Sequence, residues 1–175
     1  LSGGLDSSLV CSVASRFLKK MGLKLHTFSI GMENGTDIYY ANKVAEYIES
    51  EHTVVSITKE QALDAIRDVI WATETFDITT IRASTGQYLI GKYIGDNTDF
   101  KVVLSGDGSD EVASGYLYNF CAPSIDDLHN EAVRRVKEIH MYDGLRADRA
   151  TSIHGLELRV PFLDSAFVDY YLSIN

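Results

Sequence analysis

The loop from Ser2 to Ser8 has the composition of a phosphate-binding turn. It reads "SGGLDSS" and leads directly into a helical pattern. Gly3 and Gly4 allow positive φ angles and a close approach of the backbone to a ligand. The following helix would point its unpaired N–H groups and positive dipole end at the same place, and the hydroxyls of Ser2, Ser7 and Ser8 could add donors. The loop therefore predicts an anion site, although a plain strand-to-helix turn with a serine or aspartate cap has similar residues.

Asp6 indicates that a cation would accompany the anion. A carboxylate beside a phosphate is repelled unless a cation such as magnesium lies between the two groups. No lysine follows the glycines, so the loop is not the GxxxxGK(S/T) loop that grips β- and γ-phosphates.

A second loop, "SGDGSDE" from Ser105 to Glu111, brings three carboxylates together after a short apolar strand. Asp107, Asp110 and Glu111 would repel one another unless a cation or hydrogen bonds compensated. A solvated acidic turn is one alternative. A calcium loop is excluded, because valine and tyrosine stand where that loop needs its glycine and its last glutamate, counting from Asp107. Together the two loops predict a site for magnesium pyrophosphate or ATP.

Strands that alternate with helices must position these loops. Apolar patterns predict strands at 25–31, 52–58 and 101–104, and helices at 7–21, 37–48, 58–70 and 88–95. Thr58 and Gln61 form a capping-box signature. Such βαβ units wind into a parallel sheet with helices on both faces, and ligands bind at the carboxyl ends of its strands, where both loops fall. The last third, with helical patterns at 128–142 and 166–172, is predicted to be an all-α elaboration of this α/β fold.

Composition restricts the class of protein. The 175 residues, 45% hydrophobic and 23% charged, fit one folded domain over 1–175. No apolar run approaches the ~20 residues of a membrane span, and two cysteines without a CxxC pair fit a reducing compartment, so we expect a cytoplasmic protein without a membrane partner. The net charge of −9 argues against nucleic acid as a partner. Because a phosphate loop normally follows a buried strand, we expect the sequence to be an excerpt of a longer chain.

Several motifs resemble one known family. "LSGGLDSS" is similar to the pyrophosphate loop (PP-loop) of the N-type ATP pyrophosphatases, which cleave ATP between its α- and β-phosphates to adenylate a substrate. The segments "ETFDITTIRAS", "VLSGDGSDE", "GYLY", "APS", "LRADR" and "HGLELRVPFLD" resemble, in order and spacing, the synthetase domain of glutamine-dependent asparagine synthetases. The resemblance covers essentially the whole chain and implies an adenine nucleotide alpha hydrolase-like fold.

The resemblance implies a two-step ligase reaction. The side-chain carboxylate of aspartate would attack the α-phosphate of ATP to give β-aspartyl-AMP and pyrophosphate, and ammonia, supplied from glutamine in the full-length family, would then displace AMP. The implied partners are therefore aspartate, ATP, and ammonia or glutamine, with Mg²⁺ as the metal. A second copy of the chain, in a homodimer, is a further partner that the resemblance allows.

The same resemblance assigns roles to individual residues. The loop from Ser2 to Ser8, with Gly3, Gly4 and Ser7, would hold the β- and γ-phosphates. Asp6 and Asp110 would bind the magnesium ion. The adenosine part of ATP would contact four residues: Leu1, Ile30, Ser105 and Gly106.

Three further residues would be catalytic. Thr79 and Arg82 would lie near the reacting carboxylate and phosphate, although a helix cap and a surface charge are the alternatives from the residues alone. Asp107 stands where the family usually has a glutamate that helps to form the intermediate or acts as base toward ammonia. Because its side chain is one methylene shorter, either the loop advances to compensate or the second step is impaired.

Other functions remain open at this point. β-Lactam synthetases and other adenylating PP-loop ligases share the first step, and a tRNA-modifying relative is disfavoured by the net charge. A non-catalytic scaffold that kept ATP binding is an alternative of another class, favoured by Asp107. The family's glutaminase domain with its amino-terminal cysteine, and a lysine that it places further toward the C-terminus, are absent from these 175 residues.

Overall fold

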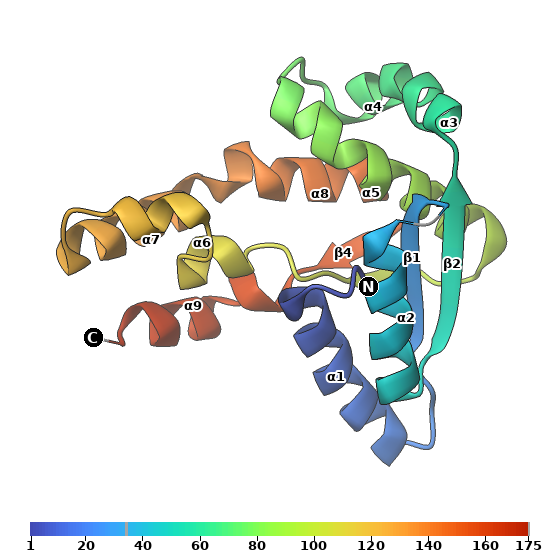
Figure 1. The fold of residues 1–175 in the computed structure, drawn as a ribbon, viewed down its shortest axis with the longest axis horizontal. Helices are drawn as coiled ribbons and strands as arrows, with labels where there is room; N and C mark the ends of the chain where they lie inside the picture. The colour runs from blue at the N-terminus through green and yellow to red at the C-terminus, as the bar shows by residue number, and fades with distance from the viewer. Residues whose placement is uncertain (34, 175) are drawn as a thin grey trace.

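The computed structural model describes residues 1–33 and 35–174 and packs helices around two short pairs of strands (Figure 1). The strands are β1 (His26–Met32), β2 (Glu51–Ile57), β3 (Val102–Leu104) and β4 (Glu157–Arg159). The α-helices are α1 (Leu5–Lys20), α2 (Thr36–Ile48), α3 (Lys59–Asp64), α4 (Ile66–Thr73), α5 (Ile78–Asn97), α6 (Ser109–Ala113), α7 (Ile125–Glu138), α8 (Asp143–Ser152) and α9 (Ser165–Leu172). Over these described ranges, no helix combines the length and the apolar character that crossing a bilayer requires.

Both strand pairs are parallel, which confirms the predicted α/β character. β1 pairs with β2 in register from His26 opposite Glu51, and β3 pairs with β4 from Val102 opposite Glu157. Helix α2 and helix α5 both contact β1. The two pairs do not join into one sheet within the described residues, and residues of both β1 and β3 line one cavity.

The C-terminal third is not all-α, and this prediction was wrong. β4 lies inside the segment "LELRVPFLD" and supplies the hydrogen-bonding partner of β3, which would otherwise have none among the described strands. Its neighbour Leu156 is buried, whereas Glu157 and Arg159 are exposed. A three-residue strand of this kind is too short to give a clear alternating pattern in the sequence.

The helices agree with the sequence patterns at some ends and differ at others. The capping box is confirmed, because Thr58 and Gln61 exchange both hydrogen bonds at the start of α3. The helix predicted at 58–70 is broken at Ala65 into α3 and α4. Helix α5 begins ten residues earlier than the predicted start at Tyr88, because the Asp77 carboxylate caps it by accepting from the Thr80 N–H at 2.7 Å. Helix α8 was not predicted.

The packing of α4, α5 and α8 fixes the helices that carry part of the site. Val69, Tyr88 and Ala150, one from each helix, form a buried cluster. Figure 1 shows α5 and α8 lying side by side above the strands. Arg149 on α8 donates to the Thr73 carbonyl at 3.0 Å and binds the Glu74 carboxylate at 2.7 Å, which ties α8 to the end of α4.

The buried cluster leads to a stability prediction. We expect Val69→Ala to lower the free energy of unfolding by about 2 kcal/mol, because it removes two buried methyl groups from a side chain that is 0% exposed. The matched control is Val13→Ala on α1, where the side chain is 43% exposed and the change should be within about 0.5 kcal/mol of zero. Urea unfolding of the two variants checks the difference; equal losses would contradict the assigned core.

Candidate functional site

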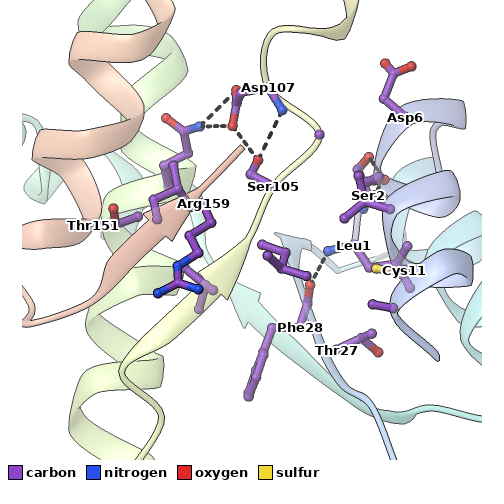
Figure 2. A pocket seen from close by; sticks show the side chains of 18 of the residues that line it. Leu1, Ser2, Asp6, Cys11, Thr27, Phe28, Ser105, Asp107, Thr151 and Arg159 are labelled. Carbon is purple, nitrogen blue, oxygen red and sulfur yellow. Dashed lines mark hydrogen bonds between the residues drawn. The ribbon is translucent and has the colours of Figure 1, made fainter. Parts of the chain in front are cut away.

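The two glycine-rich loops of the sequence meet in the structure. A Cβ added to Gly106 would lie 2.9 Å from the Ser7 amide nitrogen and 3.0 Å from the Asp6 side chain, so the second loop touches the N-terminus of α1. Figure 2 shows Ser2 and Asp6 across a cavity from Ser105 and Asp107. The cavity has a volume of about 880 Å³ and is lined by both loops, with apolar residues of α1, β1 and β3 in its deeper part. The expected proximity of the loops is confirmed.

The first loop depends on a glycine that no other residue could replace without strain. Gly3 has φ of +82°, and an added Cβ would lie 2.5 Å from the Ala41 amide nitrogen of α2. The loop is therefore pressed against α2, and this contact directs the chain into α1. The Leu1 backbone nitrogen donates to the Phe28 carbonyl of β1 at 2.6 Å, which fixes the other side of the loop (Figure 2).

The N-terminus of α1 has donors for an anion. Helix α1 begins at Leu5 with Gly4 as N-cap, and no side chain caps it. Within residues 1–33 and 35–174, no acceptor is found for the N–H groups of Leu5, Asp6 and Ser7. Such unpaired N–H groups, together with the helix dipole, favour a bound anion. The donor set therefore fits the phosphate oxygens of ATP.

The serine hydroxyls are arranged differently from one another. The Ser2 and Ser7 hydroxyl oxygens lie 3.0 Å apart and both residues line the cavity. The Ser8 hydroxyl instead donates to the Gly4 carbonyl at 2.6 Å, within the first turn of α1. The Ser7 hydroxyl also donates to the Gly4 carbonyl, but at 3.3 Å, and the Ser2 hydroxyl accepts from the Gly4 N–H at 3.3 Å. Ser2 and Ser7 therefore have the longer contacts within the loop and face the cavity, whereas the Ser8 hydroxyl is held by the helix.

Asp6 and Asp110 lie close enough to influence each other. Burial raises the pKa of the Asp110 carboxyl, and the negative charges of Asp6 and Asp143 raise it further. The described part of the chain holds no cluster of three or more His, Cys, Asp or Glu side chains that could chelate a metal without help. Mg²⁺ commonly takes one or two carboxylates together with substrate phosphates and water. Two carboxylates beside an anion site fit this pattern, and the magnesium site stays a prediction.

Asp107 is contacted by side chains from three elements. The Ser105 hydroxyl, at the end of β3, donates to its carboxylate. The Gln87 amide nitrogen of α5 lies 3.5 Å from both carboxylate oxygens, and the Arg146 guanidinium of α8 lies 3.7 Å from one. Neither Gln87 nor Arg146 was predicted as a site residue, although Arg146 belongs to the "LRADR" motif.

Behind Asp107 lies a group of buried charged residues. Glu111 and Asp143 are 4% and 8% exposed. Burial raises the pKa of the Glu111 carboxyl, with a further contribution from Asp143, and the Tyr116 hydroxyl donates to Glu111. Arg146 binds Asp143 on the same helix, and the Arg135 guanidinium lies 4.0 Å from Glu111. Buried charges of this kind need partners, and these contacts supply them.

Some predicted site residues do not line this cavity: Gly3, Ile30, Thr79 and Arg82. Ile30 faces α5, because an added Cβ on Gly86 would lie 3.8 Å from its Cγ2 atom. Thr79 and Arg82 are exposed on the first turns of α5, and Asp77 rather than Thr79 provides the cap. The remaining predicted residues do line the cavity: Leu1, Ser2, Gly4, Asp6, Ser7, Ser105, Gly106, Asp107 and Asp110.

Comparison with known proteins gives one consistent result. The family model described as asparagine synthase matches residues 1–125 and 121–175. The chain is 53% identical to the asparagine synthetase (glutamine-hydrolyzing) of Gallus gallus over 99% of its own length and 31% of the relative. The Homo sapiens and Bos taurus proteins of the same name are 52% and 51% identical over the same shares. The chain thus spans less than a third of the length of the curated relatives it matches.

The close approach of Gly3 to α2 can be tested with a matched pair of variants. Gly3 and Gly22 both have positive φ angles, +82° and +72°, but only at Gly3 would an added Cβ meet the backbone. We expect Gly22→Ala to lower the free energy of unfolding by about 1 kcal/mol through backbone strain alone. Gly3→Ala should lower it by at least about 3 kcal/mol, since the loop must also move off α2. Equal values in chemical denaturation would show that the loop does not press on α2.

Proposed function

The chain belongs to the asparagine synthase family, and from that membership we propose that it carries out the ATP-dependent chemistry of asparagine synthesis. In the first step, a side-chain carboxylate oxygen of aspartate bonds to the α-phosphorus of ATP and the bond to the β-phosphate oxygen breaks, giving β-aspartyl-AMP and pyrophosphate. In the second, the nitrogen of ammonia bonds to the activated carbonyl carbon, AMP leaves with the ester oxygen, and the nitrogen loses a proton.

One observation carries this proposal: Asp6 and Ser7, in the first turn of α1 whose N–H groups have no acceptor among the described residues, line the same cavity as Asp110. Pyrophosphate is the leaving group of the first step, so a site that stabilises its developing charge accelerates that step. The amides of Leu5, Asp6 and Ser7 would bind the β- and γ-phosphates. A magnesium ion bound by Asp6 and Asp110 would neutralise the charge that remains.

The other residues of the proposal are arranged around this anion site. Leu1, Ser105 and Gly106 line the cavity and would contact adenosine, with Ile30 behind them against α5. Thr79 and Arg82 are exposed near the start of α5 and do not line the cavity; we propose that they bind the aspartate and the reacting phosphate. Asp107 would accept the proton that the attacking nitrogen loses.

For the nitrogen donor we propose ammonia at this site. The relatives are named as glutamine-hydrolyzing enzymes, a reaction that usually needs a reactive nucleophile. Burial raises the pKa of the Cys11 thiol, which opposes formation of a thiolate, and Cys121 is exposed. We therefore assign no glutamine-hydrolysing role to the cysteines of this chain.

A product assay tests the proposed function. The protein at its natural length is incubated with ATP, Mg²⁺, aspartate and ammonia, and AMP, pyrophosphate and asparagine are measured. We expect all three in equal amounts from a competent enzyme. Asp107→Glu should raise the asparagine formed per pyrophosphate, and Asp107→Asn should lower it by about 10²-fold, the usual size of a general-base contribution. Bound nucleotide without pyrophosphate would favour a scaffold instead, and no bound nucleotide would refute the proposal.

Asp110 gives a prediction that needs no turnover. In the folded protein the pKa of the Asp110 carboxyl lies above its ordinary value, so the folded state is more stable when this carboxyl is protonated. The contribution of Asp110 to the free energy of unfolding is lost as the pH rises through the raised pKa. At pH 7 and without Mg²⁺, Asp110→Asn should therefore raise the Tm, by roughly 2 °C. Wild type should gain stability from Mg²⁺ with ATP, and the variant should gain much less. A thermal melt in which both proteins respond equally would exclude Asp110 as a metal ligand.

A further inference from the structure

The contacts of Asp107 lead to an inference about α8, which rests on the proposed function. We propose that Arg146 is a positioning residue that holds the Asp107 carboxylate in place for the second step, the attack of ammonia on the activated aspartate. None of the comparisons assigns a role to this arginine.

The Asp107 carboxylate has contacts on its own loop and on two helices. The Ser105 hydroxyl, on its own loop, is the closest partner. The contacts with α5 and α8 are longer, at 3.5 Å to the Gln87 amide nitrogen and 3.7 Å to the Arg146 Nη2 atom. The Asp107 and Arg146 side chains are only 15% and 21% exposed, so the attraction between their charges is weakly screened by water. Arg146 is therefore the charged group that attracts the carboxylate toward α8, whereas Ser105 binds it from its own loop.

Arg146 is itself fixed from behind. Its Nη1 atom binds the buried carboxylate of Asp143, one turn earlier on α8. The helix is immobilised by Ala147 and Ala150, which are 2% and 0% exposed. One edge of the guanidinium is thus tied to α8, and the other edge, through Nη2, faces Asp107. This is the arrangement by which a charged side chain orients a neighbouring carboxylate without touching the substrate.

The short side chain of Asp107 makes this orientation more important. A glutamate at this position would reach about one methylene further and could meet Gln87 and Arg146 at normal hydrogen-bond distances. With aspartate, the carboxylate can swing fully onto Ser105 if the attraction of Arg146 is removed. Proton transfer is sensitive to displacements of this size, so the second step would slow.

The first step should depend less on Arg146 than the second, because Arg146 acts on Asp110 only indirectly, through the charge of Asp143. The groups proposed to stabilise pyrophosphate are the α1 amides, Asp6 and Asp110, and none of them has a hydrogen bond or ion pair with Arg146 in the described part of the chain. Loss of Arg146 should therefore lower the amount of asparagine more than the amount of pyrophosphate. A merely structural role would lower both together.

The test compares three variants of the protein at its natural length, with pyrophosphate and asparagine measured in the same reaction. Arg146→Met should lower the asparagine formed per pyrophosphate by about 10- to 100-fold. Arg146→Lys, which keeps the charge, should retain about half of the wild-type ratio. Arg149→Met is the matched control on the same helix, since Arg149 binds Glu74 and Thr73 rather than Asp107, and its ratio should equal that of wild type.

The outcomes distinguish this inference from the proposed function. An equal fall of both products in Arg146→Met, or a wild-type ratio in that variant, would overturn the role of Arg146. If wild type releases no pyrophosphate, the proposed function fails, and crystal structures of wild type and Arg146→Met then decide the positioning role without turnover. The inference requires the Asp107 carboxylate to turn away from α8 in the variant while Asp143 and Ala147 stay in place; an unmoved carboxylate would refute it.

Discussion

The close contact between the second loop and the first turn of α1 is the constraint on which the site depends. Gly106 approaches the Ser7 amide so closely that no side chain could stand there. This contact brings the donors of a helix terminus and the carboxylates of a strand end to one cavity. Gly3 provides the matching constraint on the other side of the loop, against α2. Gly3 and Gly106 therefore set the distance between the N-terminus of α1 and the acidic loop after β3, which are about a hundred residues apart in the sequence.

Much of this arrangement could be predicted from the sequence, because it follows from local patterns. Glycine beside serine and aspartate identifies both loops in the sequence, and the alternation of strands and helices predicts that both lie at strand ends. The capping box at Thr58 is equally local. What the sequence could not give depended on tertiary contacts: β4 is defined by pairing with β3, and α8 by burial of small alanines against α4 and α5. Gln87 and Arg146 could not be predicted for the same reason, because what distinguishes them is their contact with the Asp107 carboxylate, which lies on another element.

The charged residues behind the cavity show how a polar interior is tolerated. Glu111 and Asp143 are buried carboxylates, and each has an arginine or a tyrosine hydroxyl within reach. An unpaired charge at this depth would be strongly unfavourable. Because α6, α7 and α8 each supply a member, the network also fixes these helices relative to the loop that precedes α6. Stability and alignment of the site thus come from the same contacts.

The separation of the two strand pairs has a practical consequence. Among the described residues, β1 and β3 each have one edge with no strand beside it, and these edges border the apolar part of the cavity. Open edges with apolar neighbours readily accept an additional strand from another molecule. These two edges are therefore where β-pairing with another segment would be accommodated most easily.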